Sequence, residues 1–368
     1  MADNLARVPL AVGFLGPGAI GQALLRQLAK QAPKLLNDFK LDVHVVGIAN
    51  SKSMLLSDSR INLQDWQGQF QEQAVPMVLD DFCKNLAGSA AYHRVVVDCS
   101  ASEVLTSSYS QFIECGFHII TPNKKMGSGP LDTYLSFRAL AREKGLHFLS
   151  EATVGAGLPV ISTLRTLVQT GDRILRIEGI FSGTLSYIFN NFGDGPSFST
   201  VVAGAKSKGY TEPDPRDDMT GMDVARKVVT LARECGLHVE LEDVAVQNLV
   251  PEPLRGVETA QEFLAQLPNH DAEMAKKAQD ASEMGEVLRY VGVVDGSTGK
   301  CRVELRNYLR SHPFAQLQGS DNIIMFTTER YYNNPLIVRG PGAGAEVTAA
   351  GVFGDLLSLA ESLGKPLA

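Results

Sequence analysis

The side chains best suited to proton transfer lie in an acidic stretch and in the helical pattern that follows it. Four carboxylates and two prolines occupy the stretch from Glu212 to Asp218. Apolar residues then recur at helical spacing from Val224 to Ala232, and Asp223 and Lys227 lie beside the edge of this apolar arc. A half-buried lysine facing carboxylates would have its pKa lowered by desolvation and raised by the nearby charge. Such a lysine could act as a general acid or base.

A purely structural interpretation of the same residues is equally open. Thr220 and Asp223 fit a capping box at a helix start, and Asp223 and Lys227 fit an ion pair one helical turn apart. The acidic stretch fits a solvated turn, in which Pro and Asp are common. Arg226 and Arg233 are expected to point away from the apolar arc. Spacing alone supports the two interpretations about equally.

A glycine turn near the N-terminus predicts a nucleotide-binding site. The apolar run Val8–Leu15 precedes the hexapeptide Gly16-Pro17-Gly18-Ala19-Ile20-Gly21, and a helical pattern follows. In this arrangement Gly16 permits the tight turn, Gly18 lets the backbone approach a pyrophosphate, and Gly21 lets the helix pack closely on the strand. The helix N-terminus then binds the phosphate groups. The alternative is a plain turn between a strand and a helix.

The end of the next expected strand, Val43–Ala49, bears on the choice between NAD and NADP. An acidic side chain at this point would bond the ribose 2′-hydroxyl and repel a 2′-phosphate. The sequence has Asn50 and Lys52 here instead. It therefore favours NADP and leaves NAD open, although Lys52 is as easily explained as a solvated surface residue.

Strand and helix patterns alternate up to about residue 150, which predicts a Rossmann-type, doubly wound parallel sheet in an α/β protein. The further expected strands of this sheet are Arg94–Asp98, Phe117–Thr121 and His147–Ala152. Beyond it, the strand-like runs are Ile174–Phe181, Tyr290–Val294, Val303–Leu309 and Ile323–Thr328. The last three follow one another without long crossovers, which indicates a mixed or antiparallel sheet in an α+β domain. We predict a dinucleotide-binding domain at 1–150 and 340–368, and a substrate-binding domain at 151–339.

Composition favours a two-domain protein that acts on small molecules. The chain has 368 residues, and a typical domain holds roughly 100–200. Its net charge of −7 argues against nucleic-acid or anionic-membrane partners, which require clustered Lys and Arg. The five cysteines form no CxxC pair, so we expect reduced thiols. Without a secretory signal or a membrane-length apolar run, the chain is expected to be soluble and cytoplasmic.

Several long motifs, in one order along nearly the whole chain, resemble those of homoserine dehydrogenases. They are TPNKK at 121–125, EATVGAGLP at 151–159, SGTLSYIF at 182–189, GYTEPDPRDDMTGMDVARK at 209–227 and GPGAGAEVTAAGVF at 340–353. The pattern is most similar to the dehydrogenase portion of plant and bacterial bifunctional aspartokinase–homoserine dehydrogenases. The resemblance implies a reversible, NAD(P)-dependent interconversion of L-homoserine and L-aspartate 4-semialdehyde in threonine, methionine and isoleucine biosynthesis. It also implies a homodimer formed through the second domain, and a plant parent would imply the plastid stroma.

The resemblance also assigns roles to individual residues. It implies that Lys227 is the general acid/base and that Lys125 lies in the same active site. The residues that match substrate-binding positions are Glu212, Asp218, Asp223 and Thr184. Because the substrate carries an ammonium group, this assignment would account for the acidic stretch.

Cofactor and cation contacts follow from the same resemblance. The expected cofactor-binding residues are Gly16, Gly18, Ala19, Ile20, Gly21, Asn50, Lys52, Ser100, Lys125, Gly209 and Gly344. Family members also bind a monovalent cation, usually sodium. Its expected ligands are the Glu151 side chain and the backbone carbonyls of Val154, Ala156 and Leu158.

Two other functions fit parts of the sequence. An aldehyde dehydrogenase acting on the same semialdehyde would need a nucleophilic cysteine, and Cys99 follows an expected strand. A buried, inert cysteine is the commoner explanation of such a residue. A non-catalytic NAD(P)H-sensing module would use the same Rossmann half. It would not require Lys125, Lys227 and the acidic stretch.

Overall fold

The computed structural model describes residues 8–193 and 195–363 and divides them into two compact units. The first unit contains residues 8–126, 132–157 and 344–363, and the second contains 127–131, 158–193 and 195–343. No helix within the described residues combines the length and apolar character needed to cross a membrane.

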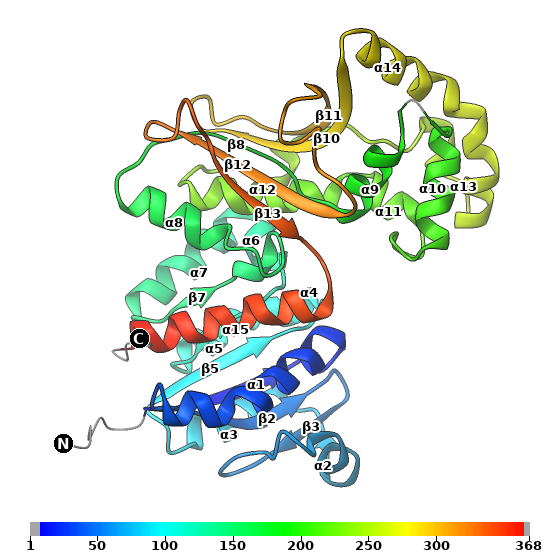
Figure 1. Ribbon diagram of the computed structural model, residues 1–368. Helices are drawn as coiled ribbons and strands as arrows, with labels where there is room; N and C mark the ends of the chain where they lie inside the picture. The colour runs from blue at the N-terminus through cyan, green and yellow to red at the C-terminus, as the bar shows by residue number, and fades with distance from the viewer. Residues whose placement is uncertain (1–7, 194, 364–368) are drawn as a thin grey trace. The chain divides into compact units, whose positions relative to one another are not determined.

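A seven-stranded sheet forms the centre of the first unit, in the order β4-β3-β2-β1-β5-β6-β7 (Figure 1). Its strands are β1 (Val8–Leu15), β2 (Leu41–Ala49), β3 (Ser53–Leu56), β4 (Val75–Pro76), β5 (His93–Asp98), β6 (His118–Ile120) and β7 (Phe148–Leu149). Strands β2, β1, β5, β6 and β7 are parallel, so the predicted Rossmann-type sheet is confirmed. Strands β3 and β4 add an antiparallel edge beyond β2 that was not predicted.

Helices cover both faces of this sheet. The helical segments between and after its strands are α1 (Ala19–Asn37), α2 (Trp66–Gln73), α3 (Leu79–Gly88), α4 (Glu103–Thr106), α5 (Tyr109–Glu114), α6 (Lys125–Ser128), whose last two residues belong to the second unit, α7 (Leu131–Glu143), the 3₁₀ helix η1 (Glu151–Thr153) and α15 (Ala345–Ser362). On one face α1 and α15 pack together and bury Leu24 and Leu356 in an apolar cluster with β1. On the other face α3, α5 and α7 bury Phe82, Phe112 and Phe137. Successive side chains of a strand point to opposite faces, so β1 supplies both clusters.

A buried histidine begins β6 in the core of this unit. His118 is only 4% exposed, and its Nδ1 accepts a hydrogen bond from the backbone N–H of His147 at 3.1 Å. The imidazole rings of His147 and His93 lie 5.4 and 6.3 Å from the His118 ring. Burial, together with these two neighbouring imidazoles, lowers the pKa of His118 from 6.5 to about 4.

We expect His118 to make the protein less stable as pH falls. Because its pKa is lower in the folded state than in the unfolded state, the unfolded chain binds the proton more readily between pH 6.5 and about 4. The free energy of unfolding should therefore lose about 3 kcal/mol across this interval. Urea unfolding at a series of pH values measures the loss. His118→Gln, which keeps an acceptor but does not titrate, should remove most of that slope, and an unchanged slope in this variant would contradict the assignment.

The second unit is built on a six-stranded sheet in the order β13-β12-β8-β10-β11-β9. Its strands are β8 (Ile174–Ile180), β9 (Ala245–Val246), β10 (Glu286–Asp295), β11 (Cys301–Leu309), β12 (Asp321–Thr328) and β13 (Leu336–Pro341). All neighbours are antiparallel except β11 and β9, so the predicted mixed sheet is confirmed. Strands β10 and β11 pair with each other, whereas β12 pairs with β8 and β13.

The helices of the second unit bring its polar residues to the end of β8. They are α8 (Ile161–Gln169), α9 (Gly183–Asn191), α10 (Phe198–Ser207), α11 (Pro215–Met219), α12 (Met222–Glu234), α13 (Ala260–Gln266), α14 (Asp271–Glu283) and the 3₁₀ helices η2 (Leu241–Asp243), η3 (Glu252–Leu254) and η4 (Leu267–His270). Helix α9 begins directly after β8, and α12 packs on β10 and β11. Figure 1 shows α12 lying along this sheet.

One prediction about α12 is wrong. Arg233 does not point away from the packed face, because its side chain is only 1% exposed. The guanidinium donates to the backbone carbonyls of Val239 and Gly127 and pairs with Glu240 at 3.3 Å. Helical spacing gives the direction of a side chain, but it does not reveal that another segment of the chain covers it.

Candidate active site

The glycine turn has the geometry that a nucleotide-binding turn requires. Gly16 has a φ of +83°, and a Cβ at Gly21 would lie 2.3 Å from the carbonyl oxygen of Gly16. These two glycines are therefore required by the turn and by the close approach of α1. Gly18 differs, because a Cβ there would meet nothing within 4 Å. The backbone at Gly18 is exposed beside the N-terminus of α1, where Ala19 and Ile20 follow.

The residues after β2 form a tight turn into β3. The side-chain oxygen of Asn50 accepts hydrogen bonds from the backbone N–H groups of Lys52 and Ser53, each at 2.8 Å. Asn50 and Lys52 are both exposed. No carboxylate occupies the turn, so the repulsion that would exclude a 2′-phosphate is missing from it.

A buried hydrogen-bond network positions the loops that follow β5 and β6. Asp98 is fully buried and accepts from the Tyr109 hydroxyl at 2.6 Å and from the backbone N–H of Ser100 at 2.8 Å. The Thr121 hydroxyl donates to the carbonyl of Asp98 and accepts from the backbone N–H of Asn123. Desolvation raises the pKa of Asp98, against the opposing effect of these hydrogen bonds. The network fixes the backbone at Ser100.

Lys125 is placed by the same loop. The Asn123 side chain accepts from the backbone N–H of Lys125 at 3.0 Å and donates to the carbonyl of Ser102 at 2.9 Å. The Lys125 ammonium pairs with the exposed carboxylate of Glu103 at 2.9 Å. The glycine turn, Ser100 and Lys125 thus all belong to the first unit. Gly344 belongs to it as well and is the N-cap residue of α15.

The second unit holds Lys227 at the buried side of α12. Its side chain is 10% exposed, and its Nζ lies 2.7 Å from the carboxylate of Asp223. The same Nζ donates to the carbonyl oxygen of Phe181, at the end of β8, also at 2.7 Å. The ion pair that the spacing predicted is therefore present. The Phe181 carbonyl could not have been predicted, since it comes from a residue far away in the sequence.

The predicted substrate-binding residues of the second unit lie together. Asp218 accepts from the backbone N–H of Glu212 at 2.8 Å and lies beside Thr184, whose hydroxyl donates to the carbonyl of Tyr210 at 2.6 Å. Burial raises the pKa of Asp218, and the charges of Glu212 and Asp223 raise it further. Gly209, with a φ of +72°, belongs to the same loop. The result is a group of carboxylates adjoining the Lys227–Asp223 pair.

The start of α12 corrects one prediction. Gly221, with a φ of +76°, is the N-cap residue, and no side chain caps this helix. Thr220 donates to the carbonyl of Asp217 and does not form the capping box expected with Asp223. The acidic stretch is also more ordered than a solvated turn, because Asp214 caps α11 and forms an ion pair with Arg216 at 2.6 Å.

The residues expected to bind a cation follow β7. Glu151 begins η1, and its backbone N–H donates to the buried carboxylate of Asp355 in α15 at 2.8 Å. Val154 and Ala156 are buried in the first unit, whereas Leu158 belongs to the second. Ala156 has a φ of +55°, a left-handed conformation that is costly for a residue other than glycine. No group of three His, Cys, Asp or Glu side chains that could hold a metal occurs among the described residues.

Cys99 does not have the character of a nucleophile. Burial and the charge of Asp98 raise the pKa of its thiol well above the ordinary value. A nucleophilic thiol requires the opposite shift, because the thiolate is the reactive form. The cysteine-dependent aldehyde dehydrogenase alternative therefore loses its main candidate.

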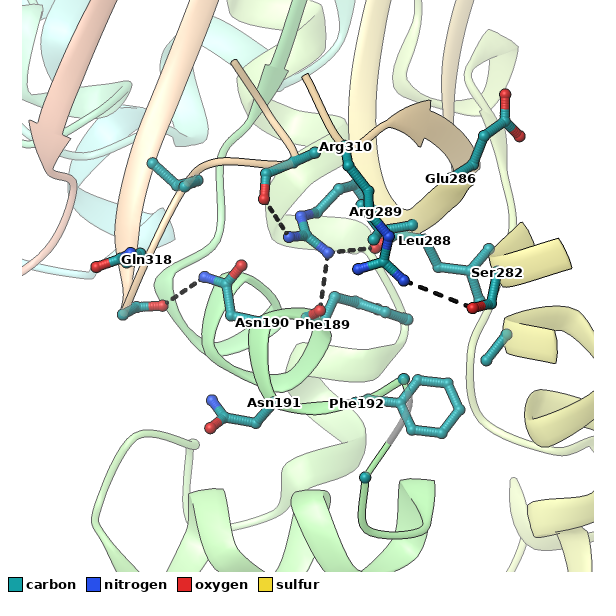
Figure 2. A pocket seen from close by; sticks show the side chains of 17 residues that line it. Phe189, Asn190, Asn191, Phe192, Ser282, Glu286, Leu288, Arg289, Arg310 and Gln318 are labelled. Atoms are coloured by element: carbon teal, nitrogen blue, oxygen red, sulfur yellow. Dashed lines mark hydrogen bonds between the residues drawn. The ribbon is translucent and has the colours of Figure 1, made fainter. Parts of the chain in front are cut away.

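A cavity of about 520 Å³ in the second unit lies between α9, α14 and β10 (Figure 2). Arg289 is buried beside it and donates to the carbonyls of Phe189, Phe314 and Ala315. This guanidinium holds three chain segments together. The residues that line the cavity include none of those predicted for the active site.

Comparison with known proteins identifies the family of this chain. The NAD-binding domain of homoserine dehydrogenase matches residues 16–151, and the homoserine dehydrogenase family model matches residues 159–357. The chain is 57% identical to the chloroplastic bifunctional aspartokinase/homoserine dehydrogenase 1 of Zea mays, over 98% of this chain and 40% of that protein. It is 45% identical to the homoserine dehydrogenase of Schizosaccharomyces pombe, over 97% of this chain and 96% of that one.

Among solved structures, a Candida auris protein of unknown function aligns with a TM-score of 0.88 at 41% identity. The alignment covers 96% of this chain and 98% of that chain. This chain spans about 40% of the length of the plant relatives and nearly all of the Schizosaccharomyces pombe relative. With both family models matched in order along the sequence, the chain belongs to the homoserine dehydrogenase family.

Proposed function

We propose that the chain interconverts L-homoserine and L-aspartate 4-semialdehyde reversibly, with NADP as the cofactor and Lys227 as the general acid/base. The placement of the Lys227 amine is the observation that carries this proposal. The amine is almost buried, is bonded to Asp223 and to the Phe181 carbonyl, and adjoins the acidic group of the same unit. The Schizosaccharomyces pombe relative, which this chain matches nearly end to end, is a homoserine dehydrogenase.

The two acceptors around Lys227 constrain how it exchanges a proton. Two of its N–H bonds are directed at Asp223 and at the Phe181 carbonyl. The remaining position on Nζ carries a lone pair in the neutral amine and a third hydrogen in the ammonium form. In alcohol oxidation the lone pair takes the hydroxyl proton of homoserine, and in aldehyde reduction the third hydrogen returns to the carbonyl oxygen. The cofactor, when bound, would accept the hydride as NADP in alcohol oxidation and supply it as NADPH in aldehyde reduction.

The acidic group suits a substrate that carries an ammonium ion. Glu212, Asp218 and Asp223 place negative charge beside the Thr184 hydroxyl. Binding a cation there would offset the cost of burying the Asp218 carboxylate, which like charges and desolvation increase. We therefore assign these residues to the amino group of homoserine.

Cofactor contacts are proposed at the glycine turn and the loops of the first unit. The residues are Gly16, Gly18, Ala19, Ile20, Gly21, Asn50, Lys52, Ser100, Lys125 and Gly344, with Gly209 from the second unit. The exposed Lys52 and the absence of a carboxylate in the turn after β2 favour NADP over NAD.

A sodium ion is proposed to bind the Glu151 carboxylate and the backbone carbonyls of Val154, Ala156 and Leu158. Carboxylate and carbonyl oxygens are hard ligands that suit such a cation. The left-handed backbone at Ala156 fits this role, because it reorients a peptide carbonyl at a conformational cost that ion binding would offset.

Assembly and context are also proposals. The sheet of the second unit is proposed to form a homodimer. The plant relatives are named as bifunctional proteins with aspartokinase, which supports a parent of that kind for this chain. We propose that the chain acts in the cytoplasm, or in the plastid stroma if its parent is a plant bifunctional protein.

Turnover of the semialdehyde tests the proposed reaction directly. We expect the purified protein to consume NADPH with L-aspartate 4-semialdehyde when sodium is supplied, and to use NADH less efficiently. Alcohol oxidation should accelerate as pH rises, because the base must be a neutral amine. A folded protein that binds NADPH but turns over neither substrate would reject the proposal and favour the NAD(P)H-sensing module.

A further inference from the structure

The carbonyl oxygen of Phe181 accepts hydrogen bonds from two side chains. One comes from the Lys227 amine at 2.7 Å, and the other comes from the Asn322 amide at 3.0 Å. A carbonyl oxygen has two lone pairs, so both bonds can form at once. The Phe181 carbonyl, which orients the Lys227 amine, is thus itself held by the side chain of Asn322. Neither the sequence motifs nor the family resemblance assigns a role to Asn322.

The sheet places Asn322 against Phe181. Strands β8 and β12 are antiparallel with Ile180 opposite Ile323. Phe181, directly after β8, therefore lies at the level of Asn322, which precedes Ile323 in β12. Asn322 is fully buried. The segment after β13 closes over it, since a Cβ at Gly342 would lie 2.0 Å from the Asn322 amide nitrogen.

Of the two polar atoms of the buried Asn322 amide, only the nitrogen has a hydrogen-bond partner among the described residues. Its Nδ2 donates to Phe181, but its Oδ1 has no hydrogen-bond partner among the residues that the structure describes. Leaving a buried acceptor unpaired costs free energy, which an apolar side chain of similar size would avoid. The amide oxygen therefore lowers the stability of the folded protein. What the amide adds at this position is the hydrogen bond that its N–H group donates to Phe181.

We propose that Asn322 is a positioning residue for the acid/base chemistry of Lys227. Its amide fixes the Phe181 carbonyl, and the carbonyl in turn holds one hydrogen of the lysine amine. The Phe181 carbonyl and the Asp223 carboxylate each bind one N–H group of the amine. Together they determine where the remaining position on Nζ points, and this is the position that gains and loses the proton. The inference rests on the proposed function, in which Lys227 transfers that proton.

The test is the pH profile of homoserine oxidation by Asn322→Leu with NADP and sodium supplied. Without the amide the carbonyl can turn away, so the ammonium form of Lys227 loses an acceptor that stabilises it. We expect kcat to fall about ten-fold or more while KM for homoserine changes less than about two-fold. The midpoint of the rising limb should move down by about half a pH unit.

Asn190 provides a matched control in the same unit. Its amide also donates to a backbone carbonyl, that of Gly319, at 2.9 Å (Figure 2), and its buried Oδ1 likewise has no partner within the described part of the chain. It lies at the C-terminal end of α9 and lines the cavity, whose lining includes none of the predicted site residues. Asn190→Leu should leave the midpoint and kcat unchanged. If Asn322→Leu changes only the thermal stability and leaves the midpoint and kcat unmoved, the role is structural and the proposal is overturned.

A second variant covers the case in which Asn322→Leu does not fold. Asn322→Ser removes the long amide and adds no bulk beneath Gly342, and it should show the same fall in kcat and the same shift. An unshifted pH profile in a folded Asn322→Ser would also overturn the proposal.

Lys227→Met distinguishes a failure of the positioning role of Asn322 from a failure of the proposed function. If it abolishes oxidation while the Asn322 variants are normal, only the positioning role fails; if it leaves oxidation intact, the proposed function fails first.

Discussion

Replacing Lys227 with methionine is expected to lower kcat by about a thousand-fold in both directions of the reaction, because proton transfer by a positioned side chain contributes about 10²–10⁴-fold. Methionine retains the length and the apolar stem of lysine but cannot exchange a proton. The side chain is 10% exposed, so the variant should pack without a large cavity. The measurement is NADPH consumption with the semialdehyde, and NADP reduction with homoserine.

Lys277 offers a matched control for this variant. It forms the same kind of ion pair, four residues from Glu273 in α14, with Nζ and Oε1 also 2.7 Å apart. Its side chain is 39% exposed, and pairs of this kind contribute little to stability. Lys277→Met should therefore keep full activity. Circular dichroism and NADPH fluorescence should show both variants folded and able to bind the cofactor. Retention of more than about a tenth of wild-type turnover by Lys227→Met would remove the lysine from the acid/base role.

The parts of the fold that follow from local patterns were predictable. The run before Gly16 is β1 over the expected residues Val8–Leu15, and the alternation of strands and helices predicted the parallel sheet. Each of these depends on the order of apolar residues within one short segment. The edge strand β4 was not predicted, because both of its residues, Val75 and Pro76, are exposed and carry no pattern of buried apolar residues.

The candidate site was predictable only in part, for a physical reason. Side chains contributed by a single helix, such as Asp223 and Lys227, follow from helical spacing. The partners that orient them are backbone carbonyls and buried amides from other segments, and Phe181 and Asn322 are both of this kind. Such contacts depend on strand register, which the separation of the strands in sequence does not determine. Long-range pairing also accounts for the error at Arg233, whose partners lie outside its own helix.

Gly18→Ala is expected to abolish most cofactor binding without unfolding the protein. A Cβ at this position meets no atom within 4 Å, and the backbone already has a φ of −78° that alanine adopts readily. The added methyl group would instead occupy the space that a pyrophosphate needs at the N-terminus of α1. We expect KM for NADPH to rise by at least about ten-fold, equivalent to about 1.4 kcal/mol of binding free energy. The melting temperature without cofactor should stay close to that of the wild type.

Gly21→Ala should behave in the opposite way, because its Cβ would lie 2.3 Å from the carbonyl oxygen of Gly16. Backbone cannot move aside as a flexible side chain can, so α1 must shift away from β1 and the cofactor-free protein should melt at a lower temperature.

Gly88→Ala controls for the added methyl group itself. A Cβ at Gly88 would also meet no atom within 4 Å, but this glycine lies outside the turn. Thermal melts with and without NADPH distinguish the cases. Gly18→Ala should lose the stabilisation by NADPH that wild type and Gly88→Ala retain, since a ligand that binds only the folded state raises its stability. If Gly18→Ala keeps that stabilisation in full, the pyrophosphate does not approach the backbone at Gly18.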